Sequence, residues 1–288
     1  MSLSSIRGTV NFVEQFQSTR RRRAQADDPS RVQTLWIVPG LPRSSTYDPK
    51  WFLTEGMGAP NVLWLTELLT QRMDLAPGMR VLDLGCGTAQ SSIFLAREFD
   101  LQVWAADLWV DPTANWRRIV TAGAAGLVHP IAVEAHNLPF ADGFFDAVVS
   151  MDAYHYFGTD ERYLPSIVSF LVSGGQIGFV APGNAVEIEE VPNGLPVGFP
   201  PADFFTFRSA QWWERMWRRS GLVEVQTAEM VPGGHSLWER SLDLEMAWFG
   251  IGENDLASGD LRMLDSSPGQ SLGFSLIVGR RSSTDGRE

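Results

Sequence analysis

One strand–turn–helix–strand stretch constrains the fold of this 288-residue chain more than any other feature. An apolar run at residues 81–84 leads into a glycine-containing turn at 85–87. A helical pattern follows over residues 89–98, and a second apolar run at 101–106 ends on Asp107. This order predicts two parallel strands joined through a helix, with the turn at the carboxyl end of the first strand.

The turn has the features of a site for a nucleoside-containing cofactor. Gly85 and Gly87 let a ligand approach the backbone, and the N-terminus of the following helix offers unpaired N–H groups. Asp107 comes roughly 20 residues after the turn, where an acidic side chain accepts hydrogen bonds from a ribose. The third glycine of a dinucleotide motif is missing, and the Asp83 carboxylate would repel a pyrophosphate but could bind an ammonium group. The pattern therefore favours a nucleoside that carries an amino acid.

Residues 82–89, which read LDLGCGTA, resemble the first motif of the class I S-adenosylmethionine-dependent methyltransferases. Three later segments resemble the third, fourth and fifth strand regions of that family, in the same order: residues 134–140, 144–150 and 174–180. Glu134 stands where the family usually has Asp. The matches cover about residues 75–182, and their order and spacing make the resemblance specific.

The resemblance implies a fold, a cofactor and a set of binding residues. The fold is α/β and doubly wound, with a mostly parallel seven-stranded sheet, an antiparallel last strand and a cap of helices and loops. The cofactor is S-adenosyl-L-methionine. In this family Asp107 would bind the ribose, Asp83 the amino group, and Glu134 with the backbone after it the adenine. The cofactor-binding residues implied are Asp83, Gly85, Cys86, Gly87, Asp107, Leu108, Glu134, Ala135, His136, Met151 and Asp152.

The chain divides into six predicted segments, of which the first is either a docking helix or a disordered arm. The segments are an N-terminal arm (1–33), a lid and helix (34–73), the cofactor-binding core (74–183), a lid loop (184–208), the rest of the core with a cap insertion near 230–268 (209–281), and a polar tail (282–288).

Composition excludes several classes of partner. The net charge of −11 repels phosphate backbones, so we expect no nucleic acid despite the arginines at 20–23. Cys86 is the single cysteine, which rules out an intramolecular disulfide and a thiolate metal cluster. No apolar stretch reaches the ~18 residues of a membrane helix, and no signal peptide pattern is present. We therefore expect a cytoplasmic protein with a small-molecule substrate, no membrane contact and no metal, and a homodimer stays open.

A base would help if the methyl acceptor is a hydroxyl or a protonated amine. His155, within residues 152–156 after the fourth strand, is the candidate catalytic residue, and the alternative is a structural or solvated histidine. His235 is the second choice. Asp152 would either accept from the cofactor's amino group or orient a substrate cation.

The leading hypothesis is a methyltransferase that acts on a small-molecule oxygen or nitrogen acceptor. The eleven tryptophans, mostly outside the cofactor core, favour an acceptor with some aromatic or apolar character. Two alternatives remain at this stage. One is carbon methylation or cyclopropanation of a lipid, and the other is a non-catalytic protein that binds S-adenosylmethionine.

Overall fold

A computed structural model gives the fold of most of the chain. The described residues are 29–187, 204–250, 256–265 and 267–283. The first 28 residues of the expected arm, most of the expected lid loop (188–203) and the end of the expected tail (284–288) lie outside the described residues. Among the described helices, none is both long enough and apolar enough to cross a membrane.

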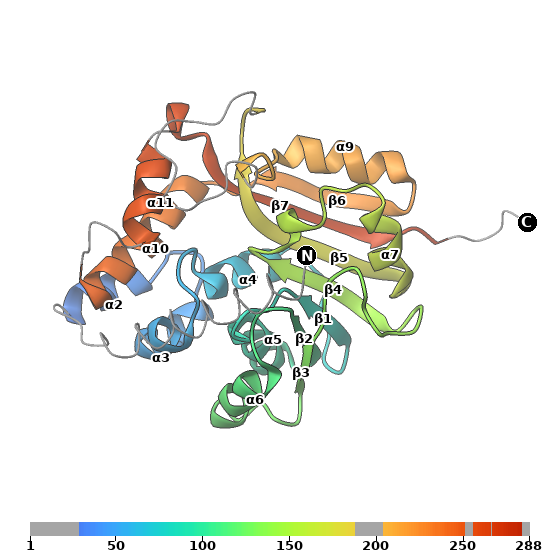
Figure 1. The fold of residues 1–288 in the computed structure, drawn as a ribbon, viewed down its shortest axis with the longest axis horizontal. Helices are drawn as coiled ribbons and strands as arrows, with labels where there is room; N and C mark the ends of the chain where they lie inside the picture. Colours follow the sequence, from blue (N-terminus) through green and yellow to red (C-terminus); the bar gives the residue numbers. More distant parts are fainter. Residues whose placement is uncertain (1–28, 188–203, 251–255, 266, 284–288) are drawn as a thin grey trace, which may run out of the picture.

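The core is a seven-stranded sheet in the order β3-β2-β1-β4-β5-β7-β6 (Figure 1). Strands β1 to β5 are parallel to one another, and β7 is antiparallel to both of its neighbours, β5 and β6. The predicted mostly parallel sheet with an antiparallel last strand is therefore confirmed. The strands are β1 (Arg80–Leu84), β2 (Gln102–Asp107), β3 (Val128–Ala132), β4 (Phe145–Met151), β5 (Leu171–Asn184), β6 (Val223–Met230) and β7 (Leu272–Arg281).

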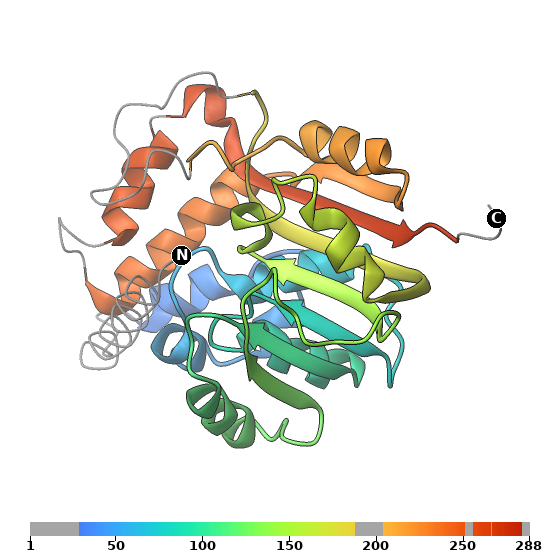
Figure 2. The same cartoon turned by 45° about the vertical axis from the view of Figure 1, so that its right-hand side comes forward.

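Helices cover both faces of the sheet because its strands are apolar on both sides. Val81 of β1 packs into the cluster under one set of helices, and the next residue, Leu82, packs into the cluster on the opposite face. This alternation is what a doubly wound sheet requires. The first face is covered by α4 (Val62–Thr70), α5 (Gln90–Phe99) and α6 (Pro112–Thr121), and the second by α7 (Tyr163–Ser169) and α9 (Ala210–Ser220) (Figure 2).

Local sequence fixes where several of these helices begin. Asn61 caps α4, since its Oδ1 accepts hydrogen bonds from two backbone N–H groups of the first turn. Ser209 caps α9 in the same way through the N–H of Trp212. On α9, Trp213 and Trp217 lie four residues apart on one face of the helix and are buried against the sheet.

A cap of four helices lies beyond the carboxyl edge of the parallel strands, on the left in Figure 1. Trp36 of the N-terminal part packs against Phe52 and Trp64, in a cluster that also contains Trp248 of the C-terminal insertion. Arg240 joins the two parts again by donating to backbone carbonyls of residues 34, 35 and 37. The cap helices are α2 (Pro29–Trp36), α3 (Pro49–Glu55), α10 (Gly234–Phe249) and α11 (Leu256–Asp265).

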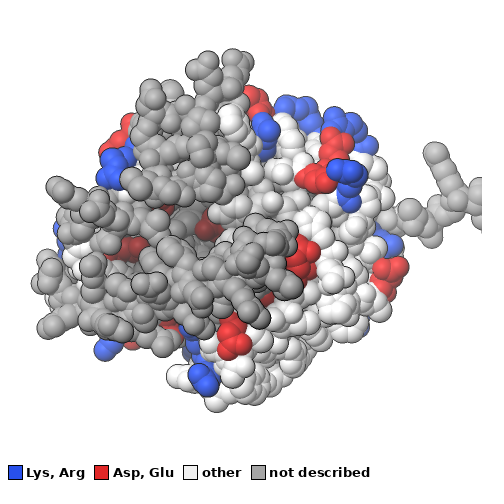
Figure 3. Space-filling view, in the orientation of Figure 1, with Lys and Arg blue, Asp and Glu red and all other residues white. Residues whose placement is uncertain are grey.

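Charged side chains are mixed over the described surface. Figure 3 shows Lys and Arg interspersed with Asp and Glu on the described part of one face. Lys and Arg side chains gather at the upper right of that view, with Asp and Glu side chains next to them.

Candidate active site

The turn after β1 is built from residues with positive φ. Gly85 has φ +75°, and Gly87 has φ +52°. A Cβ atom on Gly85 would overlap the side chain of Ala153, because the loop after β4 lies directly against this turn. Only glycine satisfies both the backbone angle and the close approach at position 85.

Asp107, at the end of β2, holds the turn in place. Its Oδ2 accepts from the backbone N–H of Gly87 at 2.8 Å, and its Oδ1 accepts from the N–H groups of Trp109 and Val110 at 2.7 and 2.9 Å. Burial raises the pKa of this carboxyl, while the three N–H groups lower it. A carboxylate offers about four lone-pair sites, so Oδ2 can still accept from a hydroxyl group.

Asp83, the last but one residue of β1, is completely buried. Its Oδ2 accepts from the hydroxyls of Ser91 and Ser92, both at 2.6 Å, in the first turn of α5. Its Oδ1 has no hydrogen-bond partner. Burial is the main cause that raises the pKa of Asp83, to about 6, and the two serine hydroxyls act against it. Sequence reasoning missed the serines, although two of them in the first turn after an acidic strand end are a readable signal.

Residues 47–58, here named the lid segment, are part of the expected lid and helix (34–73); they contain helix α3 and contact the glycine turn. The Met57 sulfur lies 3.0 Å from where a Cβ of Gly87 would be. Gln90, at the start of α5, donates to the carbonyl of Phe52 at 3.1 Å. From the other side, Asn115 of α6 donates to the carbonyl of Gly87 at 2.9 Å. Neither amide was expected from the sequence, because each acts through tertiary contacts.

The loop after β4 carries Asp152 and His155. Asp152 has φ +55°, an unusual value for a residue other than glycine and one that clusters at functional sites. His155 is fully buried in the short helix η2 (Tyr154–Tyr156), and neither ring nitrogen has a hydrogen-bond partner. Burial lowers the pKa of His155 to about 3, so the ring is neutral.

The loops after β2 and β4 meet across the end of β1, which lies between these two strands. The rings of Trp109 and Tyr156 are 6.3 Å apart. The glycine turn is therefore bounded by both loops and by the lid segment.

Comparison with known proteins identifies this region. Residues 81–175 match the family model of the methyltransferase domain. This part of the chain is a methyltransferase domain. It contains the glycine turn, Asp107 and the loop of Asp152 and His155.

Relatives and solved structures agree with the methyltransferase domain. The glycine/sarcosine/dimethylglycine N-methyltransferase of Actinopolyspora halophila is 32% identical over 124 residues, which are 41% of this chain and 22% of that protein. The Haemonchus contortus phosphoethanolamine N-methyltransferase 2 has a TM-score of 0.62 at 17% identity, over 81% of this chain and 55% of that chain. The [4+2]-cyclase SpnF has a TM-score of 0.59 at 23% identity, over 75% of this chain and 80% of that chain. These structural likenesses concern the fold, and the chain spans less than half the length of the first curated relatives.

Other predicted cofactor residues of the methyltransferase domain line the same edge of the sheet. Leu108 directly follows Asp107, and Met151 is the buried last residue of β4. Glu134 and His136 lie after β3 and are exposed, and both Glu134 oxygens bind His136, at its N–H and its Nδ1. The carbonyl of Ala135 accepts from the Tyr163 hydroxyl.

Cys86 and His235 are both enclosed by the surrounding protein. Cys86 is buried, and burial raises the pKa of its thiol, so the thiol is not activated as a nucleophile. His235 of α10 has its Nδ1 3.0 Å from the carbonyl of Leu272 and its Nε2 3.3 Å from Glu239. Its ring is therefore held by protein groups, unlike that of His155.

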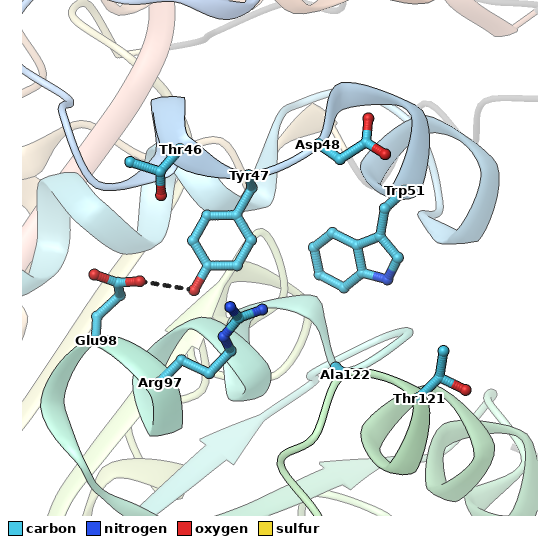
Figure 4. A pocket seen from close by; sticks show the side chains of 8 residues that line it. All are labelled: Thr46, Tyr47, Asp48, Trp51, Arg97, Glu98, Thr121 and Ala122. Carbon is cyan, nitrogen blue, oxygen red and sulfur yellow. Dashed lines mark hydrogen bonds between the residues drawn. The ribbon is translucent and has the colours of Figure 1, made fainter.

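A cavity of about 340 Å³ lies elsewhere, between the lid segment and the ends of α5 and α6. Tyr47 donates to Glu98 across it, and Trp51 and Arg97 also line it (Figure 4). Because α5 begins at the glycine turn and Arg97 and Glu98 lie in its last turn, this cavity is at the opposite end of the helix from the turn. The cavity is therefore separate from the glycine turn of the methyltransferase domain.

Proposed function

We propose that the protein is an S-adenosylmethionine-dependent methyltransferase that acts on a small-molecule oxygen or nitrogen acceptor. The observation that carries the proposal is the glycine turn with Asp83 and Asp107 beside it, at the carboxyl edge of the sheet, where the cap helices lie. In such sheets ligands bind at this edge. S-adenosylmethionine supplies a methyl group on a positively charged sulfur, which is already an activated leaving group.

The residues present fit this cofactor. Asp107 is oriented by three N–H groups and keeps a lone pair for a ribose hydroxyl. The unpartnered Oδ1 of Asp83 suits the ammonium group of the methionine end, directly or through water. Leu108 would lie against the adenine, with residues 134–136 at its edge.

The chain's own work in the reaction is alignment, exclusion of water and removal of a proton. The cap helices and the ring pair of Trp109 and Tyr156 would shield the ligand at the glycine turn from solvent. His155 would take the proton of the acceptor, since its neutral ring has free acceptor capacity.

The comparisons favour a small acceptor without fixing it. The relatives include proteins named as N-methyltransferases and as an O-methyltransferase. A geranyl diphosphate C-methyltransferase of Streptomyces coelicolor A3(2) shares the fold at 17% identity, so carbon methylation remains an alternative. The cyclase SpnF shares it too, and fold alone does not determine activity.

Calorimetry with the full chain tests the proposal. We expect S-adenosylmethionine and S-adenosylhomocysteine to bind with one site per chain, and NAD to bind at least about tenfold more weakly because the third glycine of a dinucleotide motif is absent. Isotopically labelled cofactor and metabolite extracts would then identify the acceptor. Equal affinity for NAD, or no binding of either sulfur nucleoside, would contradict the proposal.

Asp83→Asn is expected to make stability less dependent on pH. The folded pKa of Asp83, about 6, is above its unfolded value, so the folded state binds more protons between about pH 4 and 6 and stability falls as pH rises through this window. In the variant the free energy of unfolding no longer declines over this pH window, and the decline in the unmodified protein amounts to about 3 kcal/mol at most. Urea unfolding at pH 4.5 and 7.5 measures it, and Asp142→Asn, at an exposed site, is the control. Parallel pH dependence of Asp83→Asn and the unmodified protein would show that Asp83 is not desolvated.

A further inference from the structure

Carboxyl groups from three separate elements converge where the cap meets the loop after β4. They belong to Asp152 in that loop, Glu245 on α10 and Asp260 on α11. Asp260 raises the pKa of Asp152 through its charge, and Glu245 does the same to Asp260, in both cases second to burial. Met151, which directly precedes Asp152, packs in the same buried apolar cluster as Trp238 of α10 and Met263 of α11. The three carboxyl groups therefore lie on elements that pack together, and they are called the acidic cluster.

Buried polar atoms without hydrogen-bond partners lie on the same elements as the acidic cluster. Neither ring nitrogen of His155, three residues after Asp152, has a hydrogen-bond partner. The Ser241 hydroxyl on α10 is 1% exposed and also has none. Ser241 lies one helical turn before Glu245, so both side chains share one face of α10. Buried polar atoms of this kind are nearly always hydrogen-bonded, so they point to a ligand.

Aromatic rings connect the two sides of the cluster. The rings of His155 and Phe207 are 5.5 Å apart, and those of Phe207 and Trp238 are 6.3 Å apart. Trp238 is three residues before Ser241 on the same face of α10. The region thus combines carboxyl groups with aromatic faces, both of which attract organic cations.

Two carboxyl groups of the acidic cluster, those of Asp152 and Asp260, have no basic side chain paired with them in the described part of the chain. Arg240 of α10 points to the carbonyls of α2, and Arg262 of α11 is exposed. The described carboxyl and histidine groups also form no set that could hold a metal ion. The carboxyl groups and aromatic rings therefore favour an organic cation over a metal ion.

We propose that Asp152, Glu245 and Asp260, with His155, Ser241 and Trp238, bind a positively charged amine, and that the methyl acceptor of this enzyme is therefore an amine. This inference rests on the proposed function and narrows its acceptor class. When the nitrogen lone pair forms the new N–C bond, the methyl–sulfur bond breaks and its electron pair stays on sulfur. The positive charge then resides on nitrogen, beside the carboxyl groups. An acceptor that arrives as an ammonium ion first gives one proton to the neutral ring of His155, and its nitrogen lone pair then becomes available.

Binding of unreactive probes tests the cation site without knowledge of the acceptor. The full chain, saturated with S-adenosylhomocysteine, is titrated with tetramethylammonium, with choline and with 3,3-dimethylbutan-1-ol, the uncharged isostere of choline, at constant ionic strength. At least one cation is expected to bind about tenfold or more tightly than the alcohol, since the alcohol lacks the charge. If neither cation binds more tightly than the alcohol, the proposal is overturned.

Charge-removing variants locate the site. Asp260→Asn keeps the shape of the side chain and is expected to weaken cation binding by about fivefold or more, and Glu245→Gln should act in the same direction. Asp265→Asn, on the exposed side of the same helix α11, is the matched control and should leave cation binding unchanged. Equal cation affinity in Asp260→Asn and Asp265→Asn would overturn the proposal.

The affinity for S-adenosylhomocysteine separates this inference from the function on which it rests. We expect that affinity to be the same in Asp260→Asn as in the unmodified protein, which also shows that the variant is folded. Normal binding of S-adenosylhomocysteine without any preference for cations would refute the amine site alone. Failure of the unmodified protein to bind S-adenosylhomocysteine would refute both.

Discussion

Replacing His155 by alanine is expected to lower kcat by about a hundredfold, with an acceptor found by the isotope screen, and to change the affinity for S-adenosylhomocysteine by less than about threefold. The ring is fully buried, neutral and without hydrogen-bond partners, so the lone pair of one ring nitrogen is unoccupied. Steady-state kinetics and calorimetry measure the two quantities. Normal turnover in His155→Ala would remove the histidine from the mechanism.

The form of the pH profile gives a second test of His155. Because burial lowers its pKa to about 3, the ring of the free enzyme stays neutral across the working range. A fall of kcat/KM caused by its protonation is therefore expected below about pH 4 and not near the ordinary value of about 6.5. His155→Gln keeps a hydrogen-bond acceptor but no base, so restored turnover in this variant would assign the ring a positioning role.

Replacing Asp107 by alanine is expected to weaken S-adenosylhomocysteine binding by about 1 to 3 kcal/mol, or roughly 5- to 150-fold. The variant loses an ionised acceptor for the ribose and also the acceptor of three backbone N–H groups that shape the turn. Calorimetry measures the loss. Asp111→Ala is the matched control, because Asp111 is exposed and caps α6 through one N–H group. It should lower stability by about 1 kcal/mol and leave ligand affinity unchanged.

A ligand without the 2′-hydroxyl separates ribose binding from support of the turn. If Asp107 binds that hydroxyl, the loss of binding free energy on removing both the hydroxyl and the carboxylate should be much smaller than the sum of the two separate losses. The deoxy ligand should then bind the unmodified protein and Asp107→Ala with more similar affinities. Additive losses would show that Asp107 acts only by holding the loop.

The alternation of strands and helices and the position of the turn could be predicted because they depend on local sequence. Residues 81–84 and 101–106 are short apolar runs bounded by turn residues, and they form β1 and β2 within one residue of these limits. The caps Asn61 and Ser209 are equally local, since capping is a contact within one helical turn. The antiparallel β7 was expected from the family resemblance alone.

The environment of each site residue was not predictable in the same way. The sequence places Asp83 before the glycines, but only the tertiary structure buries it, gives one oxygen to Ser91 and Ser92, and leaves the other without a partner. From the sequence, His155 could be a base, a structural histidine or a solvated one. The structure excludes the solvated ring, because the side chain is fully buried. Sequence alone could not show this, since burial depends on which distant residues pack against the ring. Whether the ring is catalytic stays a prediction.

By itself, the sequence determined a doubly wound sheet with a nucleoside-type turn, because strand period, glycine positions and helix caps are encoded within a few residues of one another. The tertiary structure alone decided that α10 and α11 of the insertion meet the loop after β4 and bring Asp152, Glu245 and Asp260 into one cluster. These residues are up to 108 positions apart, since 260 minus 152 is 108. No local pattern specifies such a contact, which depends on how the cap packs on the sheet.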